Sequence, residues 1–151
     1  MRAIKFRGIG KRTGTWIYGN LIQLGGAYII VPVYDEYEVV PDHSTECALG
    51  FHEDEFDVIE PDSLGQFTGA NDAYGNEIYE GDILHVPGDD FNGEIKGVVM
   101  FEADSFVVKS IRSNWSALLA WCNRKDHETK HYVRPTKVIG NTYDNQELLK
   151  Q

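Results

Sequence analysis

The chain has 151 residues, of which 42% are hydrophobic and 25% are charged, and its formal net charge at pH 7 is −10. A chain of this length buries roughly two thirds of its unfolded surface, so it can form one or two small domains without a disulfide, a metal or a cofactor. The charged start and the short apolar runs predict no signal peptide and no membrane span, and the negative charge disfavours binding to the phosphate backbone of nucleic acids.

The first third of the chain predicts an antiparallel meander. In the opening strand, residues 4–7 alternate so that Ile4 and Phe6 are expected to face inward and Lys5 and Arg7 outward. Gly25 and Gly26 provide a hairpin turn between two apolar strands. An acidic segment between Pro32 and Pro41 is expected to add an edge strand. The other expected elements are a basic turn at 8–14, strands at 16–24 and 27–31, a loop at 42–51 and a further element at 53–60.

Residues 66–86 alternate turn formers and strand formers more sharply than any other stretch. They predict strand, turn, strand, turn, strand, with reversals at 69–72, 75–76 and 80–82. Gly69, Gly75 and Gly81 are each expected to hold a backbone angle that a side chain would strain. Asp82 is expected to accept backbone N–H groups and so fix the turn into the next strand. A structural role for this motif is therefore favoured over a ligand site.

The last third predicts two strands and then short helices. Residues 97–101 and 105–109 form a hairpin around 102–104. The spacing of Trp115, Leu118, Leu119 and Cys122 predicts a helix over 114–124. A strand at 136–139 follows, and Asp144 with Glu147 is expected to cap a one-turn helix at 148–149.

These elements predict a mainly β protein. Residues 1–62 form an N-terminal β meander with the acidic segment, and residues 63–151 form a small SH3-like barrel-type half with one or two short helices near the C-terminus. The Glu-Gly-Asp turn at 80–82 that leads into an apolar strand is typical of such barrels. The two halves are alternatively one integrated domain.

Charge is distributed unevenly along the chain. Residues 13–95 carry 18 acidic and no basic side chains, whereas the remainder carries 14 basic and 6 acidic ones. Three interpretations stay open. In the first, the basic flanks neutralise the acidic residues 13–95 within one subunit. In the second, residues 13–95 of one subunit contact the basic flanks of another in a head-to-tail ring. In the third, the acidic face is simply solvated.

Few residues suggest chemistry. Cys122, His127 and His131 would suit zinc if Cys47 or His43 joined them, but their spacing fits no common finger, and a buried thiol with exposed imidazoles is the favoured interpretation. Both cysteines are expected to be free thiols. The acidic histidine-containing segments are interpreted as solvated loops: residues 52–55, and His85 with residues 89–90. Gly10 and Lys11 lack the rest of a phosphate loop, and the many carboxylates single out no acid–base pair. No catalytic residue, metal or cofactor is assigned.

Five blocks of the chain together resemble the YopX protein family. They are residues 4–7, Trp16 to Ile22, Gly65 to Gly69, Asp72 to Ile83, and Val138 to Leu149 with its Gly140-Asn141 pair. The resemblance implies a mostly β protein encoded by bacteriophages or prophages, a homo-oligomer, and no particular activity. Ala70, Gln146 and the longer segment 113–131 depart from the family pattern. The structural motif carried over comprises Gly69, Gly75, Gly81, Asp82, Gly140 and Asn141.

Two functions from different classes follow. The first is a non-enzymatic phage accessory protein in the cytoplasm of the bacterial host, which self-assembles and offers its acidic segment 35–62 to a basic host or phage protein. The alternative is a nucleic-acid-binding small β-barrel that uses Trp16, Tyr18 and Phe106 beside basic residues. The alternative requires these aromatic rings to be exposed next to Arg and Lys.

Overall fold

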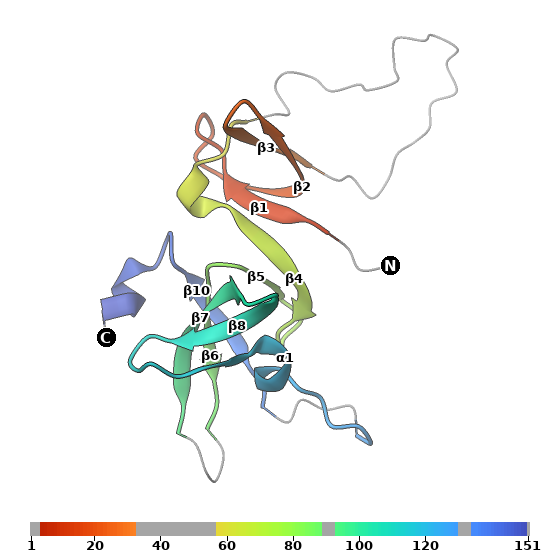
Figure 1. Cartoon of the computed structure of the whole chain (residues 1–151), viewed down its shortest axis with the longest axis vertical. Helices are drawn as coiled ribbons and strands as arrows, with labels where there is room; N and C mark the ends of the chain where they lie inside the picture. Colours follow the sequence, from red (N-terminus) through yellow and green to blue (C-terminus); the bar gives the residue numbers. More distant parts are fainter. Residues whose placement is uncertain (1–3, 33–56, 89–92, 130–133, 151) are drawn as a thin grey trace. The chain divides into compact units, whose positions relative to one another are not determined.

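A computed structural model describes residues 4–32, 57–88, 93–129 and 134–150 (Figure 1). The chain divides into two compact units. The N-terminal unit is Lys5–Leu64, and the C-terminal unit is Gly65–Gln151 with Met1–Ile4. The described residues are mainly β, with antiparallel strands and only short helical pieces, as the sequence predicts. The sheets are open, so the SH3-like barrel stays a prediction.

The N-terminal unit contains an antiparallel meander in the order β3-β2-β1. Its strands are β1 (Phe6–Ile9), β2 (Trp16–Leu24) and β3 (Ala27–Pro32). The predicted hairpin is confirmed, because Gly25 and Gly26 turn between β2 and β3 with φ of 54° and 88°. Positive φ at both central residues is what a two-residue hairpin turn requires.

The expected orientation of the first strand is wrong. Ile4 is 65% exposed, whereas Arg7 is only 8% exposed. The guanidinium carbon of Arg7 lies 4.8 Å from the centroid of the Trp16 ring. A guanidinium over an indole face gains a cation–π interaction, and its aliphatic stem can be buried with the ring. Arg7 pairs with Tyr18 and so lies on the same face of the sheet, where contact with Trp16 covers it. The local alternation does not reveal this burial.

Ile30 and Ile59 are fully buried and form the centre of the N-terminal unit. Val58 and Ile59 make isolated bridges to Ile29 and Gly10. A short 3-10 helix, η2 (Pro61–Ser63), follows, and the Ser63 hydroxyl accepts a 2.8 Å hydrogen bond from the Ile9 N–H. The expected edge strand, the loop at 42–51 and residues 53–56 lie outside the described residues.

The C-terminal unit contains a five-stranded antiparallel sheet in the order β10-β6-β7-β8-β9, and a further antiparallel pair, β4 with β5. Their bounds are β4 (Gly65–Asn71), β5 (Glu77–Tyr79), β6 (Asp82–Val86), β7 (Ile95–Glu102), β8 (Ser105–Ser110), β9 (Ser116–Leu118) and β10 (Lys137–Asn141). The core is a cluster of seven buried side chains: Ile78, Leu84, Val86, Val99, Val108, Leu119 and Cys122. The predicted hairpin between β7 and β8 is confirmed, with positive φ at Ala103 and Asp104.

The helix predicted over 114–124 is wrong in its first half. Residues 116–118 form β9, which pairs with β8, and α1 spans only Leu119–Cys122. Leu118 is 53% exposed, whereas Leu119 and Cys122 are buried. A short apolar run satisfies both periods, and the free edge of β8 decides between them by offering hydrogen-bond partners. The expected C-terminal helical turn exists as a 3-10 helix, η3 (Gln146–Lys150).

Candidate functional site

The first reversal of the glycine motif lies later than expected. β4 continues through Asn71, and Gly69 sits inside it with φ of 83°, where the register shifts. The chain turns instead between Asp72 and Asn76, with Gly75 at φ 93°. A glycine in the left-handed region inside a strand is typical of a β-bulge.

The Gly81-Asp82 pair of the motif lies at the start of β6, and the Gly140-Asn141 pair lies in the neighbouring strand, β10. Gly81 has φ of 78°, and the buried Asp82 accepts a 2.7 Å hydrogen bond from the Tyr79 N–H. The Gly81 carbonyl accepts a 2.8 Å bond from the Thr142 N–H, and Asp82 pairs with Asn141 of β10. The structure therefore brings Gly81, Asp82 and Asn141 together at one edge of the sheet.

The Gly140-Asn141 pair shapes the turn that follows β10. A Cβ atom at Gly140 would overlap the side chain of Asn145. The Asn145 Oδ1 accepts the Asn141 N–H at 3.1 Å, and the Asn141 Oδ1 accepts the N–H groups of Tyr143 and Asp144 at 2.9 and 2.8 Å. These contacts satisfy the local backbone, so the pair has a structural use.

Asp72 connects the β4–β5 turn to β10, a role that the sequence analysis did not predict. It is 1% exposed, and its Oδ1 accepts the N–H groups of Tyr74 and Asn76 at 2.8 and 2.9 Å. Its Oδ2 accepts the Asn76 Nδ2 at 2.9 Å and the Val138 N–H of β10 at 3.0 Å. Burial alone raises the pKa of Asp72, but these hydrogen bonds outweigh it and hold the pKa below its ordinary value of 3.8. An aspartate at the start of an Asp-x-x-Gly turn is the signal that could have identified it.

A second buried carboxylate organises the basic turn after β1. The Asp57 Oδ2 accepts the N–H groups of Arg12 and Thr13 at 3.0 and 2.9 Å and the Thr13 hydroxyl at 3.1 Å. Burial alone raises the pKa of Asp57, but these hydrogen bonds and the charge of Arg12 together outweigh burial, so the pKa lies below its ordinary value of 3.8. The amides next to Gly10 and Lys11 therefore hold the protein's own carboxylate.

Both carboxylates predict a loss of stability in acid. Because their folded pKa values lie below 3.8, Asp57 and Asp72 bind protons less readily when folded than when unfolded. Their stabilisation is complete above that pH and is lost as the pH falls through the folded values. The urea concentration at the unfolding midpoint should therefore decrease as the pH is lowered below about 4, and this decrease should be smaller in Asp57→Asn. An equally steep acid limb in that variant would contradict this role.

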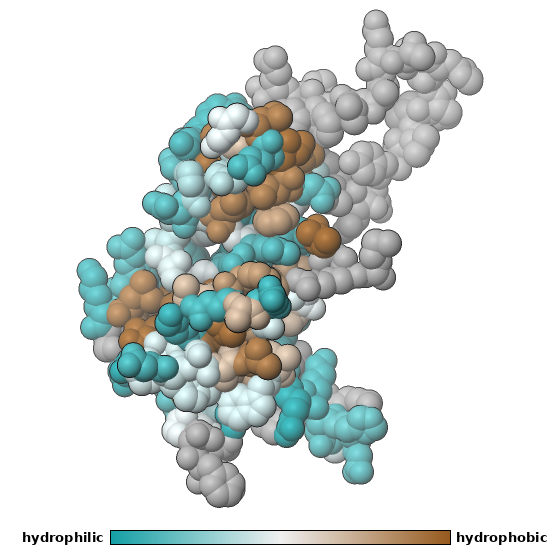
Figure 2. Space-filling view, in the orientation of Figure 1, coloured by the Kyte–Doolittle hydropathy of each residue, from teal (hydrophilic) through white to brown (hydrophobic). Residues whose placement is uncertain are grey.

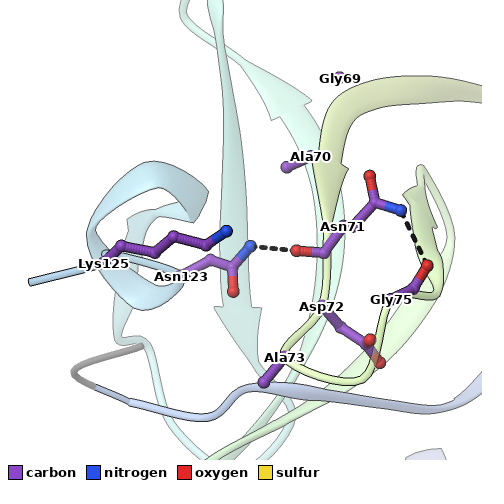
Figure 3. Close-up of a pocket in the computed structure, with 8 residues that line it drawn as sticks. All are labelled: Gly69, Ala70, Asn71, Asp72, Ala73, Gly75, Asn123 and Lys125. Atoms are coloured by element: carbon purple, nitrogen blue, oxygen red, sulfur yellow. Dashed lines mark hydrogen bonds between the residues drawn. The ribbon is translucent and has the colours of Figure 1, made fainter. Parts of the chain in front are cut away.

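A polar hollow of about 640 Å³ lies beside the end of β4. Asn71, Gly75 and their neighbours line one side, and Asn123 and Lys125 line the other (Figure 3). The Asn123 Nδ2 donates a 2.6 Å hydrogen bond to the Asn71 carbonyl, and its Oδ1 has no hydrogen-bond partner among the described residues. The lining can bind a polar group, but it pairs no nucleophile with a base.

The candidate metal ligands do not converge in the described residues. Cys122 is fully buried, and burial raises the pKa of its thiol to about 11, whereas zinc is bound by a thiolate. His127 is exposed. The remaining proposed ligands, His131, Cys47 and His43, lie outside the described residues, as do residues 52–55 and 89–90. His85 Nε2 lies 3.3 Å from the Glu94 carboxylate. In the part of the chain that the structure describes, no three His, Cys, Asp or Glu side chains group as metal ligands.

The outer face of the β2–β3 hairpin is apolar and exposed. Ile22 pairs with Ile29, which bridges to Val58, so these three side chains form a row across neighbouring segments. Leu24 lies two residues after Ile22 in β2, and Tyr18 lies four residues before it, so both are on the same face of the strand. We call the exposed members the hairpin patch: Tyr18, Ile22, Leu24 and Val58, which are 48%, 40%, 60% and 39% exposed.

Hydrophobic residues gather over strands β1 to β3 in the space-filling view (Figure 2). Residues 13–34, which include the whole hairpin, contain no charged side chain. This uncharged run is the sequence signal that could have revealed the hairpin patch. Of the other two aromatic residues of the nucleic-acid alternative, Trp16 is covered by Arg7 and Phe106 packs edge-on against Phe101 at 5.1 Å.

No helix among the described residues is both long enough and apolar enough to cross a membrane. No curated protein matches the chain significantly. A sequence model of the YopX protein family matches residues 5–150, which is nearly the whole chain. The chain therefore belongs to the YopX protein family.

Proposed function

We propose that this chain is a non-enzymatic accessory protein of a bacteriophage or prophage that acts in the host cytoplasm by binding protein surfaces, copies of itself included, through the hairpin patch. The observation that carries the proposal is an exposed apolar face on a hairpin without a charged residue, in a chain of which 25% is charged. The buried centres of protein interfaces are depleted of charge in the same way.

The size of the hairpin patch supports a binding role. Its four side chains together expose roughly 400 Å², which is in the range of the largest apolar patches on monomeric proteins, and such patches are often functional. Asn20, a polar residue on the same face of β2, is exposed and can supply part of a rim.

The use of the buried carboxylates supports a non-enzymatic role. Asp57, Asp72 and Asp82 all accept backbone N–H groups at distances of 2.7 to 3.1 Å. The pKa values of Asp57 and Asp72 are lowered, whereas a general acid that works near neutral pH needs a raised one. These groups serve as structural acceptors.

A nucleic-acid-binding small β-barrel is the alternative function. Tyr18 is 48% exposed and pairs across the strands with Arg7, which is the observation in its favour. The net charge of −10 weighs against it. Mobility shifts with single- and double-stranded DNA and RNA at low salt address this alternative directly, and a shift that Tyr18→Ala removes would replace the protein-binding proposal.

Replacing Leu24 by aspartate is expected to weaken self-association by tenfold or more, because a carboxylate would have to be desolvated in an apolar contact. Sedimentation velocity over a wide range of concentrations measures this effect. Leu118→Asp is the matched control, since Leu118 is 53% exposed on the C-terminal unit and should leave association unchanged.

The same two variants extend the test to other partners. Affinity capture from infected or prophage-bearing cells should recover proteins with the unchanged chain and with Leu118→Asp, and lose them with Leu24→Asp. A chain that stays monomeric at every concentration and captures no protein through the hairpin patch would overturn the proposed function.

A further inference from the structure

The hairpin patch is suited to one particular occupant, and this inference rests on the proposed function. Each copy of the chain carries a formal charge of −10, so two copies repel one another over most approaches. Residues 13–34 carry no charge, and the patch on their hairpin is the apolar surface described above. Two acidic copies can therefore meet at this surface with little electrostatic cost.

Symmetry makes the lack of charge more significant. In a two-fold contact the same patch faces itself, so any charged group near the axis meets a like charge. The row of Ile22, Ile29 and Val58 has none, and Leu24 extends the same face with an uncharged side chain. Arg7 lies on this face in register with Tyr18, but it is only 8% exposed and is covered by Trp16. Around the Ile22–Ile29 row the face is therefore self-complementary in polarity.

We infer that the occupant of the hairpin patch is a second copy of this chain, related by a two-fold axis that passes near the Ile22–Ile29 row. The contact is isologous and apolar. It differs from a head-to-tail ring, in which the acidic middle of one copy would bind the basic flanks of the next. A closed dimer results, because a two-fold contact uses up the patch on both copies.

Salt separates the two modes. For the isologous contact, added salt screens the repulsion between two acidic copies, so the association constant should hold or rise. A head-to-tail contact between opposite charges should weaken as salt increases. Sedimentation velocity at low and high sodium chloride measures the direction, and a large loss of association at high salt would overturn the inference.

Cross-linking locates the axis. Asn20 is an exposed polar residue on the same face of β2 as Ile22, so Asn20→Cys places a thiol beside the patch without removing an apolar side chain. The variant is made with Cys47→Ser. Cys122 can stay, because it is fully buried. A short bis-maleimide should link two Asn20→Cys copies into dimers and no larger species.

Two controls make the result specific. Adding Leu24→Asp to the Asn20→Cys variant should remove the cross-link, and Tyr74→Cys, at a position 66% exposed on the C-terminal unit, should give none. Association that persists in sedimentation without an Asn20–Asn20 cross-link would overturn the isologous mode but leave the proposed function standing. A monomer in both measurements would overturn this inference, and the proposed function would fall with it only if the affinity capture also recovered no protein through the hairpin patch.

Discussion

Replacing Asp72 by alanine should lower the free energy of unfolding of the C-terminal unit by roughly 3–5 kcal/mol. The carboxylate accepts four hydrogen bonds, from Tyr74, twice from Asn76, and from Val138. Alanine leaves these donors without their acceptor, and the turn between Asp72 and Asn76 loses the bonds that hold its shape. The link between the β4–β5 turn and β10 is lost at the same time.

Urea unfolding followed by tryptophan fluorescence measures this loss. In a Trp16→Phe background, the signal comes from Trp115 and Trp121 of the C-terminal unit. Asp104→Asn is the control, because Asp104 is an exposed hairpin residue with φ of 66°, a conformation that asparagine tolerates. A change of less than about 1 kcal/mol in Asp72→Ala would show that the four hydrogen bonds do not hold the turn to β10.

Replacing Gly19 by alanine should destabilise the N-terminal meander by about 3 kcal/mol or more. A Cβ atom at this position would overlap the carbonyl oxygen of Val31, and the Cα of Pro32 lies 2.9 Å from it. Both obstacles are backbone atoms of the paired strand, so they cannot move aside as a flexible side chain can. The pairing of β2 with β3 has to open for the methyl group to fit.

Native-state hydrogen exchange of the β2 and β3 amides measures this effect locally. Gly14→Ala separates steric overlap from backbone strain, since Gly14 has φ of 66° but open space around its Cβ direction. That control should cost only about 1 kcal/mol. Equal costs at the two positions would mean that the strands adjust to the added methyl group. Because Gly19 lies on the hairpin that carries the patch, Gly19→Ala should also weaken self-association.

The buried carboxylates hold turns and sheet edges in place, and the hairpin between β2 and β3 presents the apolar face. Stability and binding thus depend on different residues. Asp72→Ala and Leu24→Asp should therefore separate the two properties, with the first lowering the unfolding free energy and the second lowering the association constant.

Sequence alone determined the parts of this protein that depend on neighbouring residues. The Gly25-Gly26 hairpin and the β7–β8 hairpin follow from turn residues between alternating strands, and both are observed. Residues that tolerate positive φ act through their own backbone, so their effect is visible without knowledge of the rest of the chain. The family resemblance likewise rested on short blocks in a fixed order, and the match over residues 5–150 confirmed it.

Only the tertiary structure decided whether an ambiguous segment forms a helix or a strand, which side chains are buried, and which distant side chains are in contact. Arg7 is buried because Trp16 covers it, and residues 116–118 form a strand because β8 offers an edge. Asp72 bonds Val138, which is 66 residues away along the chain. The exposed face of the hairpin also depends on packing, because its strands are apolar on both sides and only the burial of Ile30 shows which side is covered. Such contacts join segments that are distant in the sequence, so a local sequence pattern does not predict them.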